Sequence, residues 1–388
     1  MNFLNSTGVA RLVDDPVFLV KTLIMYVIVG VLLYLAVVRG FEPLLLIPIA
    51  FGMFLANLPG ANLFHMEEFF LGDHVDIVQV VQEGSLIDFL YLGVKLGIYP
   101  SLIFLGIGAM TDFTPLIANP KSLFLGAAAQ LGVFVAYGGA ILIGFIPEAA
   151  ASIGIIGGTD GPTAILVTKT LAPTLLGAIA IAAYSYMALI PMIQPPFMKL
   201  LTTKKERSVV MTNLRPVSKV EKVVFPVVVT LIVVLIVPDA APLVGLLMLG
   251  NLLNVSGVTD RLSKTAQNEL INIVTIFLGV CVGATASAES FLAPTTIYII
   301  LLGLAAFCIS TCGGLIGGKI MYALTGGKIN PLIGSAGVSA VPMAARVSQM
   351  VGQKENPSNF LLMHAMGPNV AGVIGSAVCA GVFLNLFK

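Results

Sequence analysis

The sequence predicts an all-α polytopic membrane protein, built from two inverted repeats of about five transmembrane helices in the manner of elevator-type transporters. Of the 388 residues, 57% are hydrophobic and only 10% are charged, whereas soluble domains carry about 25% charged residues. Two interrupted apolar segments in corresponding places of the two halves indicate the transporter-like architecture. Nucleic-acid binding is excluded as a function class, because a formal net charge of +1 leaves no basic face.

Apolar runs that approach the length of a membrane-crossing helix, about 20 residues, occur five times in each half. They lie at 22–39, 43–58, 93–110, 122–146 and 174–195, and again at 223–238, 242–255, 268–288, 295–318 and 358–386. A charged stretch from Lys199 to Lys222 separates the two sets. We therefore expect a first repeat over 20–197, a cytoplasmic linker over 198–222 and a second repeat over 223–388.

Short motifs recur in the same order in the two halves, which favours a true internal repeat. Ile-Phe-Leu-Gly occurs at 103–106 and at 276–279, and each copy is followed by Gly-Ala and then by a proline. Upstream, the segments 43–57 and 242–254 each run from a proline to an asparagine. Five crossings plus one segment that dips in and returns give each repeat the opposite orientation to the other.

The charge distribution predicts how the chain is oriented. The positive-inside rule places the basic stretch before residue 223 in the cytoplasm, and the acidic loop 60–92 then falls outside. In this topology both termini lie outside. The interrupted segment 147–172 enters from outside, and its counterpart 330–357 enters from the cytoplasm, so that the two breaks are expected to meet near the midplane.

A carboxylate in a helix break is the feature around which the chain is organised. Asp160 is surrounded by Gly157, Gly158, Gly161 and Pro162, which do not continue a regular helix. A charge at membrane depth costs about 2.5–3.5 kcal/mol on insertion scales, and broken backbone is tolerated there only when it lines a cavity or is buried in protein. Taken alone, the stretch could also be a Gly/Pro turn outside the membrane. The two-repeat arrangement favours an ion site.

Oxygen-bearing side chains in the broken segments predict a site for Na⁺ or another hard cation, whose ligands are carboxylate, hydroxyl, amide and carbonyl oxygens. The candidate ligands are Asp160, Thr163, Asn330, Ser339 and Asn369. Ser335 and Asn330 could instead only bridge neighbouring helices, at about 0.6 kcal/mol each. The sequence offers no cluster of cysteine and histidine that suggests a transition metal.

Other polar residues allow more than one interpretation. Tyr184 and Tyr186 lie well inside a crossing, which favours buried hydroxyls over interfacial anchors. Arg346 follows the second break and is either a cytoplasmic positive-inside charge or an anion-binding group. Asp112 is expected to cap a helix.

At these residues the sequence resembles the membrane-embedded β subunits of biotin-dependent, sodium-translocating decarboxylases, which act on oxaloacetate, methylmalonyl-CoA or glutaconyl-CoA. The resemblance rests on Gly-Ala-Met-Thr-Asp-Phe at 108–113, Ile-Gly-Gly-Thr-Asp-Gly-Pro-Thr at 156–163, Ala-Tyr-Ser-Tyr at 183–186, and the stretches 330–346 and 360–376. The family usually has alanine where this chain has Thr159. The loop 60–92 looks shorter than in the oxaloacetate members, so the acyl-CoA members fit slightly better.

The resemblance implies a carboxybiotin decarboxylase subunit that couples decarboxylation to outward Na⁺ transport and consumes a proton. It implies that Asp160 and Asn369 ligate Na⁺, that Ser339 and Tyr186 serve the ion site and the proton path, that Asn330 and Gly334 shape the second break, and that Arg346 meets carboxybiotin. Physically, a guanidinium can pair the carboxylate of carboxybiotin, and a desolvated carbamate loses CO₂ more readily.

The chain has no Met-Lys-Met biotinylation motif, so we expect the biotin on a partner. The resemblance implies a biotin carrier subunit, a carboxyltransferase subunit and a small membrane-anchor subunit as partners, together with homo-oligomerisation in the bacterial inner (cytoplasmic) membrane. The alternative is an elevator-type Na⁺-coupled carboxylate symporter without decarboxylase activity. It would use the same fold and the same Asp160 site.

Overall fold

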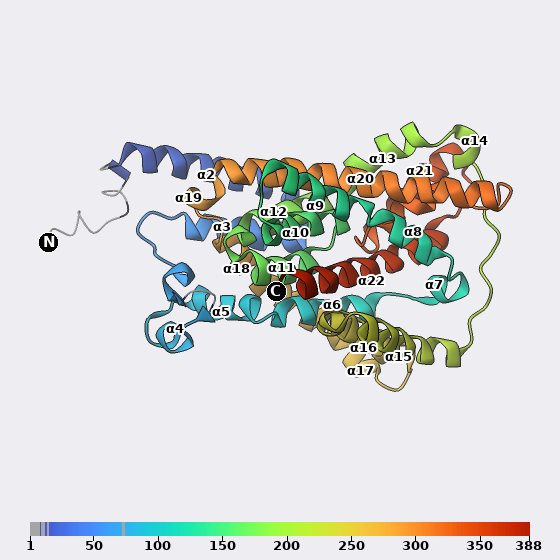
Figure 1. Ribbon diagram of the computed structural model, residues 1–388, viewed down its shortest axis with the longest axis horizontal. Helices are drawn as coiled ribbons and strands as arrows, with labels where there is room; N and C mark the ends of the chain where they lie inside the picture. Colours follow the sequence, from blue (N-terminus) through green and yellow to red (C-terminus); the bar gives the residue numbers. More distant parts are fainter. Residues whose placement is uncertain (1–7, 9–11, 14, 72–73) are drawn as a thin grey trace.

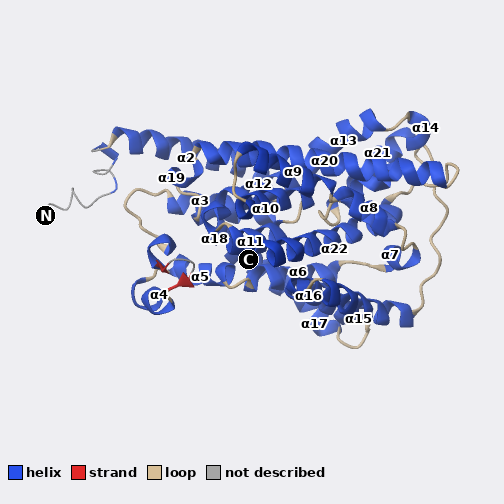
Figure 2. Cartoon of the chain, viewed as in Figure 1, coloured by secondary structure: helices blue, strands red, loops and turns tan. Residues whose placement is uncertain are grey.

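The structure is a computed structural model that describes residues 8, 12–13, 15–71 and 74–388. These residues form helices joined by loops, and a short antiparallel ribbon of β1 (Phe70–Leu71) and β2 (His74–Val75) lies in the acidic loop (Figure 2). Residues 72–73 of that loop lie outside the described ranges. The predicted all-helical membrane class is therefore confirmed.

The first half of the chain contains helices that correspond to its five predicted crossings and to the first interrupted segment. They are α2 (Pro16–Val37), α3 (Pro43–Ala56), α4 (Ile77–Glu83), α5 (Leu86–Lys95), α6 (Ile98–Met110), α7 (Thr114–Ala118), α8 (Ser122–Ala129), α9 (Leu131–Ile143), α10 (Pro147–Gly154), the 3₁₀ turn η3 (Ile155–Gly158), α11 (Gly161–Leu171), α12 (Leu176–Ala188) and α13 (Ile190–Leu201). Short 3₁₀ turns, η2 (Met66–Phe69) and η4 (Pro173–Leu175), lie in the connections.

The second half begins after helix α14 (Lys204–Arg207), which lies in the charged stretch between the two sets of apolar runs. Its elements are α15 (Lys219–Ile236), η5 (Pro238–Ala240), α16 (Ala241–Val255), α17 (Asp260–Thr265), the π-helical turn η6 (Ala266–Leu270), α18 (Ile271–Ala284), α19 (Ala288–Phe291), α20 (Pro294–Leu324), the 3₁₀ segment η7 (Pro331–Gly337), α21 (Met343–Glu355) and α22 (Leu362–Phe387). Each predicted crossing thus coincides with a helix or a pair of consecutive helices.

Length and composition qualify six helical stretches of the described chain as membrane spans, or up to eight if each of two bent pairs is one span. One pair, α5 and α6, bends by 65° at Gly97, which has a φ of +79° that favours glycine. The other joins Pro173–Met187 to α13 with a bend of 63°. Helix α3 has only 14 residues and is shorter than the predicted crossing.

Capping residues explain where several helices begin. Asp15 precedes α2, and its carboxylate accepts hydrogen bonds from the backbone N–H groups of Val17 and Phe18. Ser218 and Glu221 form a capping box at the start of α15. Such side chains satisfy the N–H groups that a helix N-terminus leaves unpaired.

Two helix pairs join the halves of the chain: α3 packs along α18, and α6 packs along α16. In both pairs, glycines let the two backbones approach closely. The measure of this approach is the distance from a Cβ atom built on each glycine to the nearest carbonyl oxygen of the partner helix. These distances are 2.2 Å from Gly52 to Val280, 2.0 Å from Gly283 to Ile49, 2.0 Å from Gly250 to Leu105, and 1.8 Å from Gly108 to Leu247. The same contact therefore occurs twice, with the roles of the two halves exchanged.

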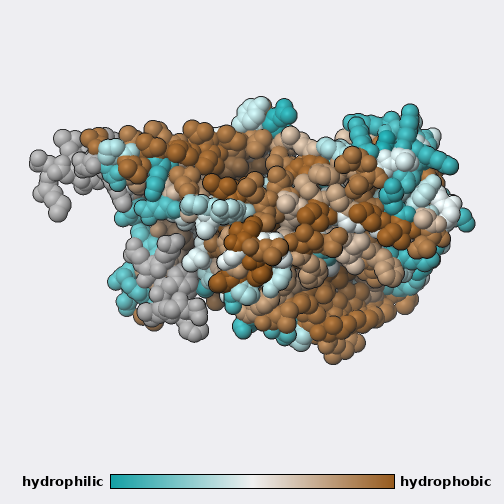
Figure 3. All heavy atoms as spheres, turned by 45° about the horizontal axis from the view of Figure 1, so that its top comes forward, coloured by the Kyte–Doolittle hydropathy of each residue, from teal (hydrophilic) through white to brown (hydrophobic). Residues whose placement is uncertain are grey.

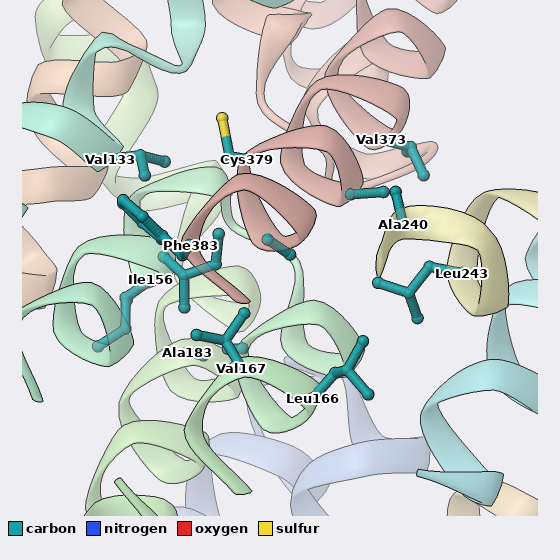
Figure 4. Packing of buried hydrophobic residues seen from close by; sticks show 14 of the residues in the cluster. Val133, Ile156, Leu166, Val167, Ala183, Ala240, Leu243, Val373, Cys379 and Phe383 are labelled. Atoms are coloured by element: carbon teal, nitrogen blue, oxygen red, sulfur yellow. The ribbon is translucent and has the colours of Figure 1, made fainter. Parts of the chain in front are cut away.

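The interrupted segments pack around the two long helices of the second half. Helix α20 contacts η7, α8, α9 and α12, whereas α22 contacts α8, η7, α11 and α21. Apolar side chains from both halves fill the space around α22, among them Val133, Ile156, Val167 and Phe383 (Figure 4). Within each segment the two arms pack on each other, α10 on α11 and η7 on α21. Each interrupted segment therefore folds back on itself.

Hydrophobic residues cover much of the molecular surface. In Figure 3 a broad hydrophobic area occupies the middle, and hydrophilic residues gather mainly toward the ends. The loop with α4 lies at one end of the molecule, and α14 and α21 lie toward the other (Figure 1). Large apolar side chains such as Phe124, Leu142 and Leu235 are exposed. An apolar surface of this extent fits a protein surrounded by lipid.

Candidate functional site

The two interrupted segments meet through their backbones. The first break comprises η3 and Thr159, which adopts a left-handed φ of +54°, and the second lies between η7 and α21. The Ser339 N–H donates a hydrogen bond of 3.1 Å to the Gly158 carbonyl, and the Ser339 hydroxyl donates to the same oxygen. The predicted helix breaks are confirmed, and they form one junction inside the protein.

Asp160 is the N-cap residue of α11 and is only 5% exposed. Its Oδ1 accepts a hydrogen bond of 3.2 Å from the Thr163 N–H, and its Oδ2 accepts one of 2.9 Å from the Ser376 hydroxyl. No lysine, arginine or histidine of the described ranges forms an ion pair with it. Because a buried carboxylate with only neutral donors is costly, the site favours a bound cation or a proton.

Several buried oxygens near this junction have no hydrogen-bond partner among the residues that the structure describes. They are Thr163 Oγ1, Asn369 Oδ1, Gln130 Oε1 and the Tyr184 hydroxyl. Buried polar atoms are normally satisfied, so each exception calls for an explanation. A hard cation binds oxygens of these kinds, and the residues present therefore fit Na⁺.

Asn369 is oriented by the carbonyls of the second break. Its Nδ2 donates to the carbonyl oxygens of Ala336 at 3.0 Å and of Val338 at 2.6 Å. Both N–H groups are used in this way, which leaves the Oδ1 atom free to bind a ligand. Asn369 thus satisfies broken backbone with one end of its amide and offers an acceptor with the other.

Two residues at the junction were missed in the sequence analysis. Ser376 lies seven residues after Asn369, on the same face of one helix, and its Oγ is 3.3 Å from Ser339 Oγ. Gln130 joins α8 to α9 and donates from Nε2 to the Gly372 carbonyl at 3.3 Å. Its Oε1 would lie 3.5 Å from a Cβ built on Gly158. Helix spacing could have identified Ser376, and a single amide in an apolar run could have identified Gln130.

The two tyrosines of α12 face different neighbours. The Tyr186 hydroxyl donates to the Ile300 carbonyl of α20, and its ring packs on Gly303, where a Cβ would lie 2.9 Å from a ring carbon. The Tyr184 ring packs on Gly161, next to Asp160, where a Cβ would lie 2.1 Å from Cε1. Both side chains are buried, so the expectation of buried hydroxyls is confirmed.

Asn330 and Gly334 lie at the entry to the second break, and no hydrogen bond of the described chain joins either to Asp160. The Asn330 Oδ1 accepts from the Leu332 N–H at 3.0 Å, and its Nδ2 donates to the linker carbonyls of Arg207 and Val209, both at 2.9 Å. A Cβ on Gly334 would lie 2.0 Å from the Gly314 carbonyl of α20. Both residues hold η7 in place.

Arg346 lies in the first turn of α21 and is exposed. No ion pair links it to a carboxylate within the described part of the chain. Its charge nevertheless reaches Glu42, which precedes α3: burial raises the pKa of the Glu42 carboxyl, and Arg346 opposes that rise. Arg346 is therefore an exposed cationic side chain in the first turn of α21, close to the second break.

Asp112 was expected to cap a helix, but the N-cap residue of α7 is Phe113. Asp112 precedes it, and its Oδ1 accepts a hydrogen bond of 2.9 Å from the Thr114 N–H in the turn that leads into α7.

Comparison with known proteins identifies the family. Residues 21–387 match the family model described as the Na⁺-transporting oxaloacetate decarboxylase beta subunit. The chain is 60% identical over 374 residues to the methylmalonyl-CoA decarboxylase subunit beta of Propionigenium modestum, covering 94% of this chain and 95% of that protein. It is 58% identical over 363 residues to the glutaconyl-CoA decarboxylase subunit beta of Acidaminococcus fermentans, covering 94% of this chain and 92% of that protein. It is 52% identical over 407 residues to the oxaloacetate decarboxylase beta chain of Klebsiella pneumoniae, covering 93% of this chain and 94% of that protein. The chain therefore belongs to the Na⁺-transporting oxaloacetate decarboxylase beta subunit family, and it is the beta subunit of a Na⁺-translocating decarboxylase.

Proposed function

We propose that this subunit decarboxylates carboxybiotin delivered by a partner and uses the reaction to move Na⁺ outward, with uptake of one proton. The observation that carries the proposal is the environment of Asp160. This carboxylate is buried, receives two neutral hydrogen bonds and has no cationic partner in the described chain. Either Na⁺ or a proton can neutralise it, so that one can replace the other at the same atom.

In this proposal the Na⁺ site is built from both breaks and from α22. Asp160 supplies the negative charge, and Thr163 Oγ1 and Asn369 Oδ1 supply acceptors that are otherwise unsatisfied. Ser339 joins the breaks and, through Ser376, faces the carboxylate. Asn330 and Gly334 act by shaping the second break, since the oxygen of Asn330 is already bonded to Leu332. Tyr186 anchors α12 to α20 on the proton path.

An architecture of two inverted repeats, 20–197 and 223–388 around the linker 198–222, is supported by paired contacts between the halves. The glycine contacts of α3 with α18 recur in α16 with α6. Carbonyls freed by each break accept from the other half: Ser310 donates to Gly157 at 2.7 Å, and Gln194 donates to Ser335 at 2.9 Å. The folded-back segments fit re-entrant hairpins, 147–172 from outside and 330–357 from the cytoplasm.

The packing supports our proposal of an elevator-type movement. The α3–α18 and α6–α16 pairs form two tight crossings between the halves. The breaks are instead held by α8, α9, α20 and α22. We propose that this second group of helices moves relative to the first and carries the Asp160 site between the two sides.

Arg346 is the proposed contact for the carboxylate of carboxybiotin. It is exposed and cationic, and it lies in the first turn of α21, on the segment that enters from the cytoplasm in the proposed topology, where a biotin-bearing partner would approach. A guanidinium can hold a carboxylate through two parallel hydrogen bonds. Loss of CO₂ from carboxybiotin leaves a ureido nitrogen that takes up one proton.

The partners in the proposal are a biotin carrier, a carboxyltransferase and a small membrane-anchor subunit, in a complex that contains several copies of the beta subunit in a bacterial cytoplasmic membrane. The relatives named for methylmalonyl-CoA and glutaconyl-CoA are 58–60% identical to the chain, against 52% for an oxaloacetate relative. This difference favours an acyl-CoA as the carboxyl source. The test is whether the complex in proteoliposomes moves Na⁺ when it decarboxylates, and whether that movement requires Asp160.

A further inference from the structure

Tyr184 is a buried polar side chain for which neither the motifs nor the proposed mechanism gives a role. It is 1% exposed and is among the largest fully buried side chains of the described chain. Its hydroxyl has no hydrogen-bond partner within that part of the chain. Because buried tyrosine hydroxyls usually find a partner, the exception indicates that the oxygen serves a group from outside the chain.

The Tyr184 ring is held beside Asp160 by a glycine. A Cβ built on Gly161 would lie 2.1 Å from Cε1 and 2.4 Å from Cζ, the atom that bears the hydroxyl. No other residue type fits at position 161 unless the ring moves. The phenol therefore lies against the residue that follows Asp160.

The packing of α12 distinguishes Tyr184 from Tyr186. Tyr184 belongs to the apolar cluster that contains Ile49 of α3 and Leu278 of α18, whereas Tyr186 belongs to the cluster around α22. The Tyr186 hydroxyl is already bonded to the Ile300 carbonyl. The Tyr184 side chain therefore lies between the Asp160 site and the α3–α18 pair. Its hydroxyl oxygen has no hydrogen-bond partner in the described chain.

We propose that the Tyr184 hydroxyl is an oxygen ligand of the translocated Na⁺, and that residue 161 is glycine so that the ring can lie in place. The inference deepens the proposed function and rests on Asp160 as the Na⁺ site. A neutral phenol oxygen adds a ligand without adding charge. The site then keeps the single negative charge that one Na⁺ or one proton neutralises.

The experiment replaces Tyr184 by phenylalanine, which keeps the ring and removes only the oxygen. Two readouts are taken on the purified complex: the rise of the melting temperature with Na⁺, which reports binding, and the Na⁺ dependence of decarboxylation. We expect Tyr184→Phe to raise the Na⁺ half-saturation about tenfold in both, as the loss of a group that supports a metal site does. Turnover at saturating Na⁺ is retained.

The matched control is Tyr298→Phe, because Tyr298 lies on α20 and is 48% exposed. This substitution should leave both readouts at wild-type values. If Tyr184 only fills space, Tyr184→Phe binds Na⁺ like the wild type and the inference fails. Asp160→Asn separates that result from failure of the proposed function. If Asp160→Asn loses the Na⁺ response while Tyr184→Phe responds to Na⁺ like the wild type, only the ligand role of Tyr184 is overturned. If Asp160→Asn itself responds normally to Na⁺, the proposed function is overturned.

Discussion

The Ser339 backbone N–H donates to the Gly158 carbonyl at 3.1 Å, so that residues 181 positions apart in the chain join the two helix breaks. The Ser339 hydroxyl reinforces this bond and lies beside Ser376, which donates to Asp160. Two hydroxyls, those of Ser339 and Ser376, thus connect the junction of the breaks to the carboxylate. This link gives the proposed coupling a physical route.

Ser339→Ala tests that route. The substitution removes the hydroxyl and leaves the backbone bond, so we expect the free energy of unfolding to fall by about 1 kcal/mol and Na⁺ activation to weaken. Thermal unfolding in detergent and the Na⁺ dependence of decarboxylation measure the two effects. Ser208→Ala is the control, because the Ser208 hydroxyl bonds to Lys204 at the exposed linker. Equal behaviour of the two variants would mean that the junction does not need the hydroxyl.

Gly108→Ala should separate α6 from α16, because the new Cβ would lie 1.8 Å from the Leu247 carbonyl. Overpacking of this kind costs about 1–3 kcal/mol, so we expect a lower melting temperature and a lower yield of folded protein. Gly245→Ala, in the same helix pair, meets no atom within 4 Å and should be tolerated. If Gly108→Ala is as stable as Gly245→Ala, the tight crossing is not needed for the fold.

Single cysteines at Glu148 and Lys354 test the proposed inverted topology, in a background that lacks the four native cysteines. Glu148 is partly exposed at the start of α10, and Lys354 is exposed at the end of α21. A membrane-impermeant thiol reagent should label position 148 only from outside and position 354 only from the cytoplasm. Labelling of both from one side would contradict the inverted repeats.

Arg346→Lys should slow decarboxylation of carboxybiotin and leave the Na⁺ half-saturation nearly unchanged. Lysine keeps the charge but cannot form two parallel hydrogen bonds to a carboxylate. The lost contact is worth about 1.5–3 kcal/mol, or roughly ten- to a hundred-fold in rate if it forms mainly in the transition state. Turnover measured against Na⁺ concentration separates the two effects. Arg261→Lys, in the exposed start of α17, is the control. A strong shift of the Na⁺ midpoint with normal saturated turnover would place Arg346 in the cation pathway instead.

The sequence was sufficient to predict the features that depend on chain composition and on local conformation. Apolar runs located the helices, and glycine and proline around Asp160 located the first break, because these residues limit backbone conformation regardless of tertiary contacts. The hydrogen bond from the Thr114 N–H to Asp112 has the same local origin.

Features that depend on helix rotation could not be predicted in this way. Tyr184 and Tyr186 differ by two positions, or about 200° around the helix, so that one faces Gly161 and the other faces α20. Sequence alone does not reveal which side of α12 packs on which neighbour. The same holds for Gln130, whose approach to Gly158 depends on the packing of α9 against η3.

The most direct test of the central claim is Na⁺ uptake into inside-out proteoliposomes of the complete complex, measured together with decarboxylation, for wild type, Asp160→Asn and Asp112→Asn. Asparagine keeps the shape of the buried side chain and removes its charge, while at position 112 its amide oxygen can accept the Thr114 N–H as the aspartate oxygen does. We predict that Asp160→Asn assembles normally but shows neither Na⁺ uptake nor Na⁺ activation, and that Asp112→Asn retains both. Na⁺ uptake at the wild-type rate by a fully assembled Asp160→Asn complex would contradict the account.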